Sequence, residues 1–177
     1  MIEAAQVAER LFDFADPASA DAWSPIGDPV MGGVSSGGLF PVEGGAAAFV
    51  GEVSLERGGG FASVRSAPGR FDLSRHERLF LDVRGDGKVY KLSLRTDPFL
   101  DGVSYQAPFA TKAGAWISVE LTLSSFRATW RGRPVPGAPP LDPSAVTTFG
   151  LLVSGRQAGP FRLEIAAIRA GGPGRLG

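Results

Sequence analysis

The chain has 177 residues, and its 18 basic residues balance 18 acidic residues, so its formal net charge is zero. This length predicts one domain, which we assign to residues 1–170, followed by a flexible tail at 171–177. Zero net charge disfavours bulk binding to nucleic acid or anionic lipid, and the absence of cysteine excludes disulfides, zinc–thiolate sites and thiol nucleophiles.

The N-terminal segment does not have the pattern of an export signal. Glu3 and Glu9 interrupt it, and no apolar stretch of the chain approaches the roughly 20 residues that span a bilayer. We therefore expect a cytoplasmic protein without a transmembrane segment.

Short segments of alternating apolar and polar residues recur between clusters of glycine and proline. A period of two is typical of half-buried strands. It predicts nine strands, at residues 10–14, 47–55, 61–66, 78–84, 89–96, 103–109, 116–122, 148–154 and 161–168. The only helix we expect is a short one near residues 2–10. This pattern predicts an all-β fold, a β-sandwich or jelly roll.

Three connections have a distinctive composition. Residues 84–88 read Arg-Gly-Asp-Gly-Lys between two strong predicted strands, and the glycines suit a tight turn, so we predict a β-hairpin there. The proline-rich segment 131–143 does not suit a sheet interior and predicts a long ordered loop across the outside of the sandwich. Asp142 is expected to cap a short turn at 143–146.

The residue types needed for catalysis are sparse. His76 is the only histidine, and its polar connector predicts a solvated side chain; no Gly-x-Ser-x-Gly motif accompanies it. Asp97, Asp101 and Gly102 offer oxygen atoms for calcium, whereas a turn stabilised by the Asp side chains explains the same residues without a metal. We predict no cofactor, no metal site and no enzymatic activity.

Several separated motifs follow one another in a fixed order along the chain. They are Asp28-Pro-Val-Met-Gly-Gly-Val-Ser35, Gly59-Gly-Phe-Ala-Ser-Val-Arg65, Asp101-Gly-Val-Ser-Tyr-Gln106 and Gln157-Ala-Gly-Pro-Phe161. Through them, residues 11–169 resemble the complex I intermediate-associated protein 30 family. The resemblance implies a galactose-binding-like β-sandwich, no established enzymatic activity and, for mitochondrial members, a role in assembling respiratory complex I. The first residues are not of the Arg-rich, acid-poor targeting type, so we do not transfer a mitochondrial address.

The candidate binding residues lie in the motifs, in the polar strands and at the start of the proline-rich loop. Arginine, tyrosine and glutamine side chains on a sheet suit sugar hydroxyls, carboxylates or the polar backbone of a partner. Strand alternation directs Tyr105 and Gln106 to opposite sides unless a bulge intervenes, and pairing with an Asp is the alternative for Arg65 and Arg95. The full set is Asp28, Met31, Ser35, Arg65, Arg95, Tyr105, Gln106, Trp130, Arg131, Arg133 and Gln157.

These features lead to one functional prediction and two alternatives. The leading hypothesis is a non-catalytic protein-binding module, an assembly factor whose partner is a subunit of a respiratory or other membrane-associated electron-transfer complex. The first alternative is a carbohydrate-binding module, in which exposed tryptophan rings stack on sugars. We expect Trp116 to pack within the fold, and Trp130 suits packing and sugar stacking equally. An enzyme that uses acidic residues in a loop cleft is the weaker alternative.

Overall fold

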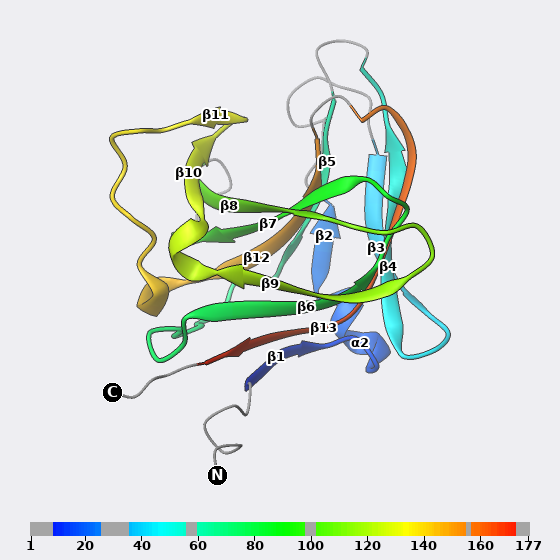
Figure 1. Cartoon of the computed structure of the whole chain (residues 1–177), viewed down its shortest axis with the longest axis horizontal. Helices are drawn as coiled ribbons and strands as arrows, with labels where there is room; N and C mark the ends of the chain where they lie inside the picture. Colours follow the sequence, from blue (N-terminus) through cyan, green and yellow to red (C-terminus); the bar gives the residue numbers. More distant parts are fainter. Residues whose placement is uncertain (1–8, 26–35, 56–59, 98–101, 155–156, 173–177) are drawn as a thin grey trace.

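A computed structural model describes residues 9–25, 36–55, 60–97, 102–154 and 157–172, which form two antiparallel sheets packed face to face (Figure 1). One sheet has six strands in the order β3-β4-β13-β6-β9, and β1 pairs with β13. Its strands are β3 (Ser36–Val42), β4 (Ala46–Val53), β13 (Gly159–Gly171), β6 (Arg78–Arg84), β9 (Trp116–Thr122) and β1 (Glu9–Asp13). The predicted all-β class is confirmed.

The other sheet has seven strands in the order β11-β10-β8-β7-β12-β5-β2. They are β11 (Arg133–Pro134), β10 (Arg127–Trp130), β8 (Ser104–Ala110), β7 (Val89–Arg95), β12 (Thr148–Val153), β5 (Ala62–Ser66) and β2 (Trp23–Pro25). All nine predicted strands are present. The sequence analysis missed β2, β10 and β11, which are only two to four residues long. It also missed β3, because this strand contains two glycines and a proline, residue types that are depleted in strands.

The core lies between the sheets and follows the predicted alternation. On β7, Tyr90, Leu92 and Leu94 are fully buried, while the residues between them are partly exposed. The Tyr90 ring lies 6.3 Å from that of Phe49 on β4 and 6.4 Å from that of Phe161 on β13, so aromatic contacts join the two sheets. Burying each large apolar side chain contributes roughly 1.5–3 kcal/mol.

The predicted N-terminal helix is wrong where it can be compared. Glu9 and Arg10 belong to β1, opposite Ala170 and Arg169 of β13, and residues 1–8 lie outside the described residues. Pairing with a central strand outweighs the local helical preference of this segment. The α-helix that the described residues do contain is α2 (Pro17–Asp21).

Aspartate caps begin two of the three short helical elements that the structure describes. Asp16 accepts a hydrogen bond from the backbone N–H of Ala18 at 3.0 Å at the start of α2. The predicted turn after Asp142 is confirmed as the 3-10 helix η4 (Pro143–Ala145), where the Asp142 carboxylate accepts from the Ser144 N–H at 3.0 Å. A further 3-10 helix, η3 (Leu123–Ser125), precedes β10.

The predicted hairpin at residues 84–88 is wrong, because β6 and β7 belong to different sheets. The segment is a crossing connection from the six-stranded to the seven-stranded sheet. Gly87 has the expected positive φ of 93°. A glycine-rich turn supplies the same backbone freedom to either kind of connection, so its composition does not reveal whether the next strand pairs with the previous one.

Asp86 and Thr111 hold this crossing connection in place. The Asp86 carboxylate accepts hydrogen bonds from the Tyr90 hydroxyl (2.9 Å), the Lys88 N–H (3.1 Å) and the Arg162 N–H of β13 (2.8 Å). The Thr111 hydroxyl donates to the Lys88 carbonyl at 2.7 Å. One carboxylate therefore joins the crossing turn, a buried tyrosine of the seven-stranded sheet and the long strand of the other sheet.

β13 extends to Gly171, the first residue of the predicted tail, and residues 173–177 lie outside the described residues. Among the helices that the structure describes, none has the length and apolar character required to cross a membrane.

Candidate functional site

The outward-facing side of the seven-stranded sheet collects most of the predicted strand residues. The strand registers align one residue from each of six strands into a single row across the sheet: Ser24, Arg65, Gly150, Ser93, Gln106 and Arg127. Neighbouring strands lie about 4.8 Å apart, so the four strand spacings between Arg65 and Arg127 measure about 19 Å.

Further outward positions flank this row on the same sheet. They alternate with buried residues such as Val64, Leu92 and Leu151, whose side chains enter the core. The outward-facing side is termed the polar face, and it comprises Ser24, Ser63, Arg65, Val89, Lys91, Ser93, Arg95, Ser104, Gln106, Pro108, Ala110, Arg127, Thr129, Pro134, Thr148, Gly150 and Leu152.

Arg65 and Arg95 form a half-buried cationic pair on this face. Burial is the largest cause that lowers the pKa of Arg65 to about 10, and the positive charge of Arg95 lowers it further, against the attraction of Asp97. Arg95 donates a hydrogen bond to the Gly102 carbonyl at 2.8 Å. Asp97 therefore acts on Arg65 through its charge, and a binding role of the two arginines stays a prediction.

Gly150 lies near the centre of the row and is buried. A Cβ atom added to it would lie 2.6 Å from the Ser93 hydroxyl and 3.1 Å from the Val64 carbonyl, so no other residue fits without a shift. The Ser93 side chain thus occupies the space beside the bare backbone. On the next strand, Gln106 donates from its amide to the Ser104 hydroxyl at 3.0 Å. These groups form a polar surface of hydrogen-bonded side chains.

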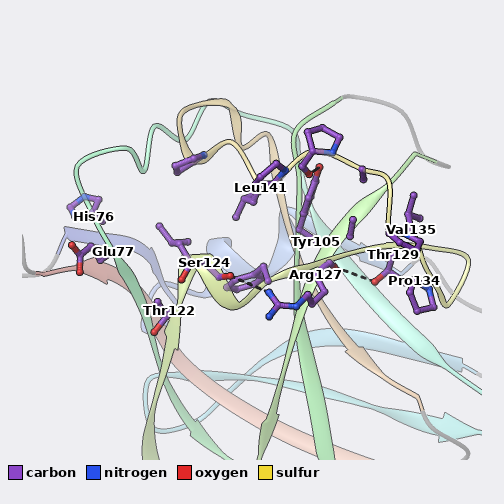
Figure 2. Close-up of a pocket in the computed structure, with 18 residues that line it drawn as sticks. His76, Glu77, Tyr105, Thr122, Ser124, Arg127, Thr129, Pro134, Val135 and Leu141 are labelled. Carbon is purple, nitrogen blue, oxygen red and sulfur yellow. Dashed lines mark hydrogen bonds between the residues drawn. The ribbon is translucent and has the colours of Figure 1, made fainter.

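The polar face differs in charge from the outer face of the six-stranded sheet. Lys91 and Arg127 have no ion pair within the described residues; Arg127 donates instead to the Ser124 carbonyl at 3.1 Å (Figure 2). Outward arginines of the six-stranded sheet each have an acidic partner, although two of them share Glu164; the pairs are Arg84–Glu164 (2.8 Å), Arg162–Glu164 (3.0 Å), Arg169–Asp82 (2.8 Å), Arg78–Glu120 (2.9 Å) and Arg10–Asp13 (3.3 Å).

Tyr105 and Gln157, two of the predicted binding residues, instead support the backbone. Tyr105 is buried on the side opposite to Gln106, as the alternation predicts, and its hydroxyl donates to the Pro139 carbonyl at 2.9 Å. The Gln157 side chain bonds both backbone groups of Val89, accepting at 2.9 Å and donating at 2.7 Å. It therefore fixes the start of β7.

Trp130, Arg131 and Arg133 lie together at the edge of the seven-stranded sheet. Trp130 is 43% exposed, and the Arg131 guanidinium lies 5.0 Å from the centre of the Trp130 ring. Arg133 of β11 is the strand-pairing partner of Trp130 of β10. Because Thr129 faces outward, alternation directs Trp130 away from the polar face.

Trp116 does not pack within the fold, so that prediction is wrong. It is 45% exposed on β9, the edge strand of the six-stranded sheet, where the Arg84 guanidinium lies 5.4 Å from its ring centre. Trp23 is only 5% exposed and belongs to the core; its ring N–H finds no hydrogen-bond partner among the described residues. No aromatic side chain occurs at the described positions of the polar face.

The predicted proline-rich loop is an ordered strap that lines one side of an open pocket of about 880 Å³ at one end of the sandwich. His76 and Glu77 lie at one end of this pocket, and Pro134 and Val135 lie at the other (Figure 2). Within the strap, the two residues of β11 pair with β10, so the segment is not a loop throughout.

The predicted solvated histidine is also wrong. The His76 side chain is 17% exposed, and its Nε2 lies 3.0 Å from a carboxylate oxygen of Glu9. Pairing across 67 positions of sequence could not be anticipated from the polar connector around the histidine.

Some predicted residues cannot be placed. Asp28, Met31 and Ser35, with the glycine-rich segment around them, lie outside the described residues, as does Asp101 of the possible calcium loop. Asp97 packs its carboxylate against Gly102, where a Cβ atom would come within 2.6 Å of it. Within the described ranges, no three His, Asp or Glu side chains gather to hold a metal ion.

Sequence reasoning missed four members of the row, Ser24, Ser93, Arg127 and Gly150. Gly150 carried a usable signal, because a glycine inside a strong strand marks a bulge or a close approach. Ser93 and Arg127 become neighbours of Gln106, and Ser24 becomes a neighbour of Arg65, only through the strand order, which the sequence did not reveal.

Comparison with known proteins places the sequence among relatives of one kind. The profile of the family described as Complex I intermediate-associated protein 30 (CIA30) matches residues 12–165. "Complex I intermediate-associated protein 30, mitochondrial" of Drosophila melanogaster is 30% identical over 179 residues, which cover 88% of this chain and 60% of the relative. The mouse protein of the same name is 31% identical over 102 residues, or 55% of this chain and 31% of the relative. The chain thus spans 60% or less of either relative.

Solved structures share the fold at low sequence identity. The family 11 carbohydrate-binding module from Clostridium thermocellum, in complex with a β-1,3-1,4-mixed-linked tetrasaccharide, has a TM-score of 0.69 at 15% identity and covers 94% of this chain and 97% of its own. The agarase AgWH50C has a TM-score of 0.62 at 15% identity and covers 95% of this chain and 25% of its own. These likenesses confirm the galactose-binding-like β-sandwich.

Proposed function

This chain belongs to the complex I intermediate-associated protein 30 family, and on that premise we propose that it is a non-catalytic protein-binding module. In this proposal it holds an intermediate during the assembly of a respiratory, complex I-like or other membrane-associated electron-transfer complex. The observation that carries the proposal is the polar face, whose central row aligns polar side chains from five strands and a glycine from a sixth.

The polar face suits a protein partner better than a reacting small molecule. Its groups are hydroxyls, an amide and guanidinium groups spread over a sheet, and such groups match the carbonyls and carboxylates of another polypeptide. They stand on paired strands whose backbone loses little freedom on binding, so the cost of ordering the surface is low.

The alternative of a carbohydrate-binding module has less support. The likeness to sugar-binding modules concerns the fold, which hosts many functions. Stacking on a sugar needs an exposed flat ring, and the exposed rings of Trp116 and Trp130 lie off the polar face. A cytoplasmic location is likewise part of our proposal, whereas the two named relatives are described as mitochondrial.

The test is affinity purification of the tagged chain from its native organism, followed by mass spectrometry. We expect enrichment of subunits of one membrane-associated electron-transfer complex, and a lower amount of the assembled complex on native gels after deletion. Recovery of no such subunits would refute the proposed function.

A matched pair of variants tests whether the polar face is the binding surface. Gln106→Trp places a large ring in the row, and Ser118→Trp places the same ring on β9 of the six-stranded sheet. We expect only Gln106→Trp to lose the recovered subunits. Equal recovery by both variants would show that the partner binds elsewhere.

A further inference from the structure

We infer that the polar face recognises an acidic stretch of its protein partner, laid across the strands so that carboxylates pair with the cations of the face. This inference rests on the proposed function and adds the chemistry of the segment that is bound.

Charge is segregated between the two outer faces of the sandwich. The described positions of the polar face include four cations and no acidic residue: Arg65, Lys91, Arg95 and Arg127. Asp97 follows β7 and attracts Arg65, but its influence on that group is smaller than the repulsion from Arg95. The chain as a whole has no net charge, so this face is a local positive surface on a neutral protein.

The contrast with the opposite sheet shows that the surplus is not a general property of the fold. Four outward arginines of the six-stranded sheet each have an acidic partner within 3.0 Å. Lys91 and Arg127 have none among the described residues. Two cations on one face are thus left for charges that come from another molecule.

The spacing of the two remaining cations fits an extended polypeptide. Lys91 and Arg127 lie two strand spacings apart across the sheet and two residues apart along the strands, which gives a separation of about 12 Å. An extended chain rises about 3.3 Å per residue, so two carboxylates about four residues apart in such a segment span that distance. An even separation also directs both of them to the same side of the extended chain.

The remaining groups of the row favour a peptide over a sugar or a nucleic acid. Guanidinium groups bind carboxylates through paired hydrogen bonds, and the Ser93 hydroxyl and Gln106 amide are suited to main-chain groups. The Ser93 side chain fills the space beside the bare backbone of Gly150, so the Ser93 hydroxyl is the group presented at that point of the row. The described positions of the face have no ring on which a sugar or base would stack.

The experiment measures binding of end-blocked octaglutamate and octaglutamine peptides to the whole purified chain by isothermal titration calorimetry. We expect octaglutamate to bind, octaglutamine not to bind, and the affinity for octaglutamate to fall as salt is added, because exposed charges are screened.

Two double variants with the same change in net charge locate the binding. Lys91→Gln with Arg127→Gln removes two cations from the polar face, whereas Arg70→Gln with Lys112→Gln removes two exposed cations from loops. We expect the first pair to weaken octaglutamate binding about tenfold, equivalent to about 1.4 kcal/mol, and the second pair to change it less than about twofold. Circular dichroism and thermal melts establish that both proteins are folded.

Equal weakening by the two double variants would overturn the inference, since the peptide would then respond to net charge alone. Tighter binding of an octauridylate RNA or of a mixed-linked glucan tetrasaccharide than of octaglutamate would overturn it as well. If octaglutamate fails to bind while the purification recovers electron-transfer subunits, only this inference fails. If octaglutamate binds as expected and no such subunits are recovered, the proposed function fails instead.

Discussion

Replacing Asp86 with alanine tests how the two sheets are held in relation to each other. The substitution removes the acceptor for the hydroxyl of Tyr90, which is fully buried, and for two backbone N–H groups near the surface. A buried hydroxyl without an acceptor costs about 1–3 kcal/mol, whereas groups that regain water cost less than about 1 kcal/mol each. We therefore expect Asp86→Ala to lower the free energy of unfolding by about 2–4 kcal/mol.

The assay is urea unfolding of four proteins: the parent chain, Asp86→Ala, Tyr90→Phe and the double variant. In the Tyr90→Phe background no hydroxyl is left without a partner, so Asp86→Ala should cost about 1–2 kcal/mol less than in the parent. Asp72→Ala serves as the control, because Asp72 also accepts bonds in a turn, from Ser74, but stabilises no buried group. A small loss for Asp86→Ala that is the same in both backgrounds would refute the role of this carboxylate as a tie between the sheets.

The other predictions concern single residues described above. Gly85→Ala should destabilise the chain by about 1–3 kcal/mol, because the added Cβ would meet the Thr111 side chain at 2.3 Å. The measurement is the urea midpoint, which should fall. An unchanged midpoint would show that the crossing connection accommodates the methyl group. Burial, followed by the charge of Asp86, raises the pKa of Tyr90 above its usual 10, so above pH 10 the unfolded chain loses this proton while the folded chain keeps it. The advantage of the parent over Tyr90→Phe should thus be constant below pH 10 and shrink by about 1.4 kcal/mol per pH unit above it, and a constant gap up to pH 11.5 would contradict the burial. Trp116→Ala should change stability by less than about 1 kcal/mol, because its contact with Arg84 is exposed; it should also leave the recovery of partner subunits intact, whereas a loss of recovery would indicate that the six-stranded sheet binds the partner.

The strands of this fold are well predicted from the sequence because most of them have one buried face. In β6 and β7 the alternation of residues gives both the strand and the side chains that enter the core. The short strands β2 and β11 have too few residues to show a period, and each contains proline. They are strands because a neighbour offers hydrogen bonds, which is a property of the tertiary structure.

The candidate site was predicted only in part, for a related reason. Alternation correctly separated Gln106 from Tyr105 and grouped Lys91 with Arg95. Which residues of different strands become neighbours depends on strand order and register, and the mistaken hairpin between β6 and β7 shows that local turn chemistry does not supply that order. The row on the polar face therefore becomes visible only in three dimensions.

The position of β13 sets the order in which a newly made chain can acquire its structure. This strand pairs with β4, β6 and β1, three segments that are synthesised much earlier. While the ribosome is still translating, those segments have apolar faces and free strand edges but lack the member that joins them. Such edges are prone to pairing with other chains. Completion of the six-stranded sheet must therefore wait until residues up to Gly171 have left the exit tunnel, and a ribosome stalled shortly before that point would display an aggregation-prone nascent polypeptide.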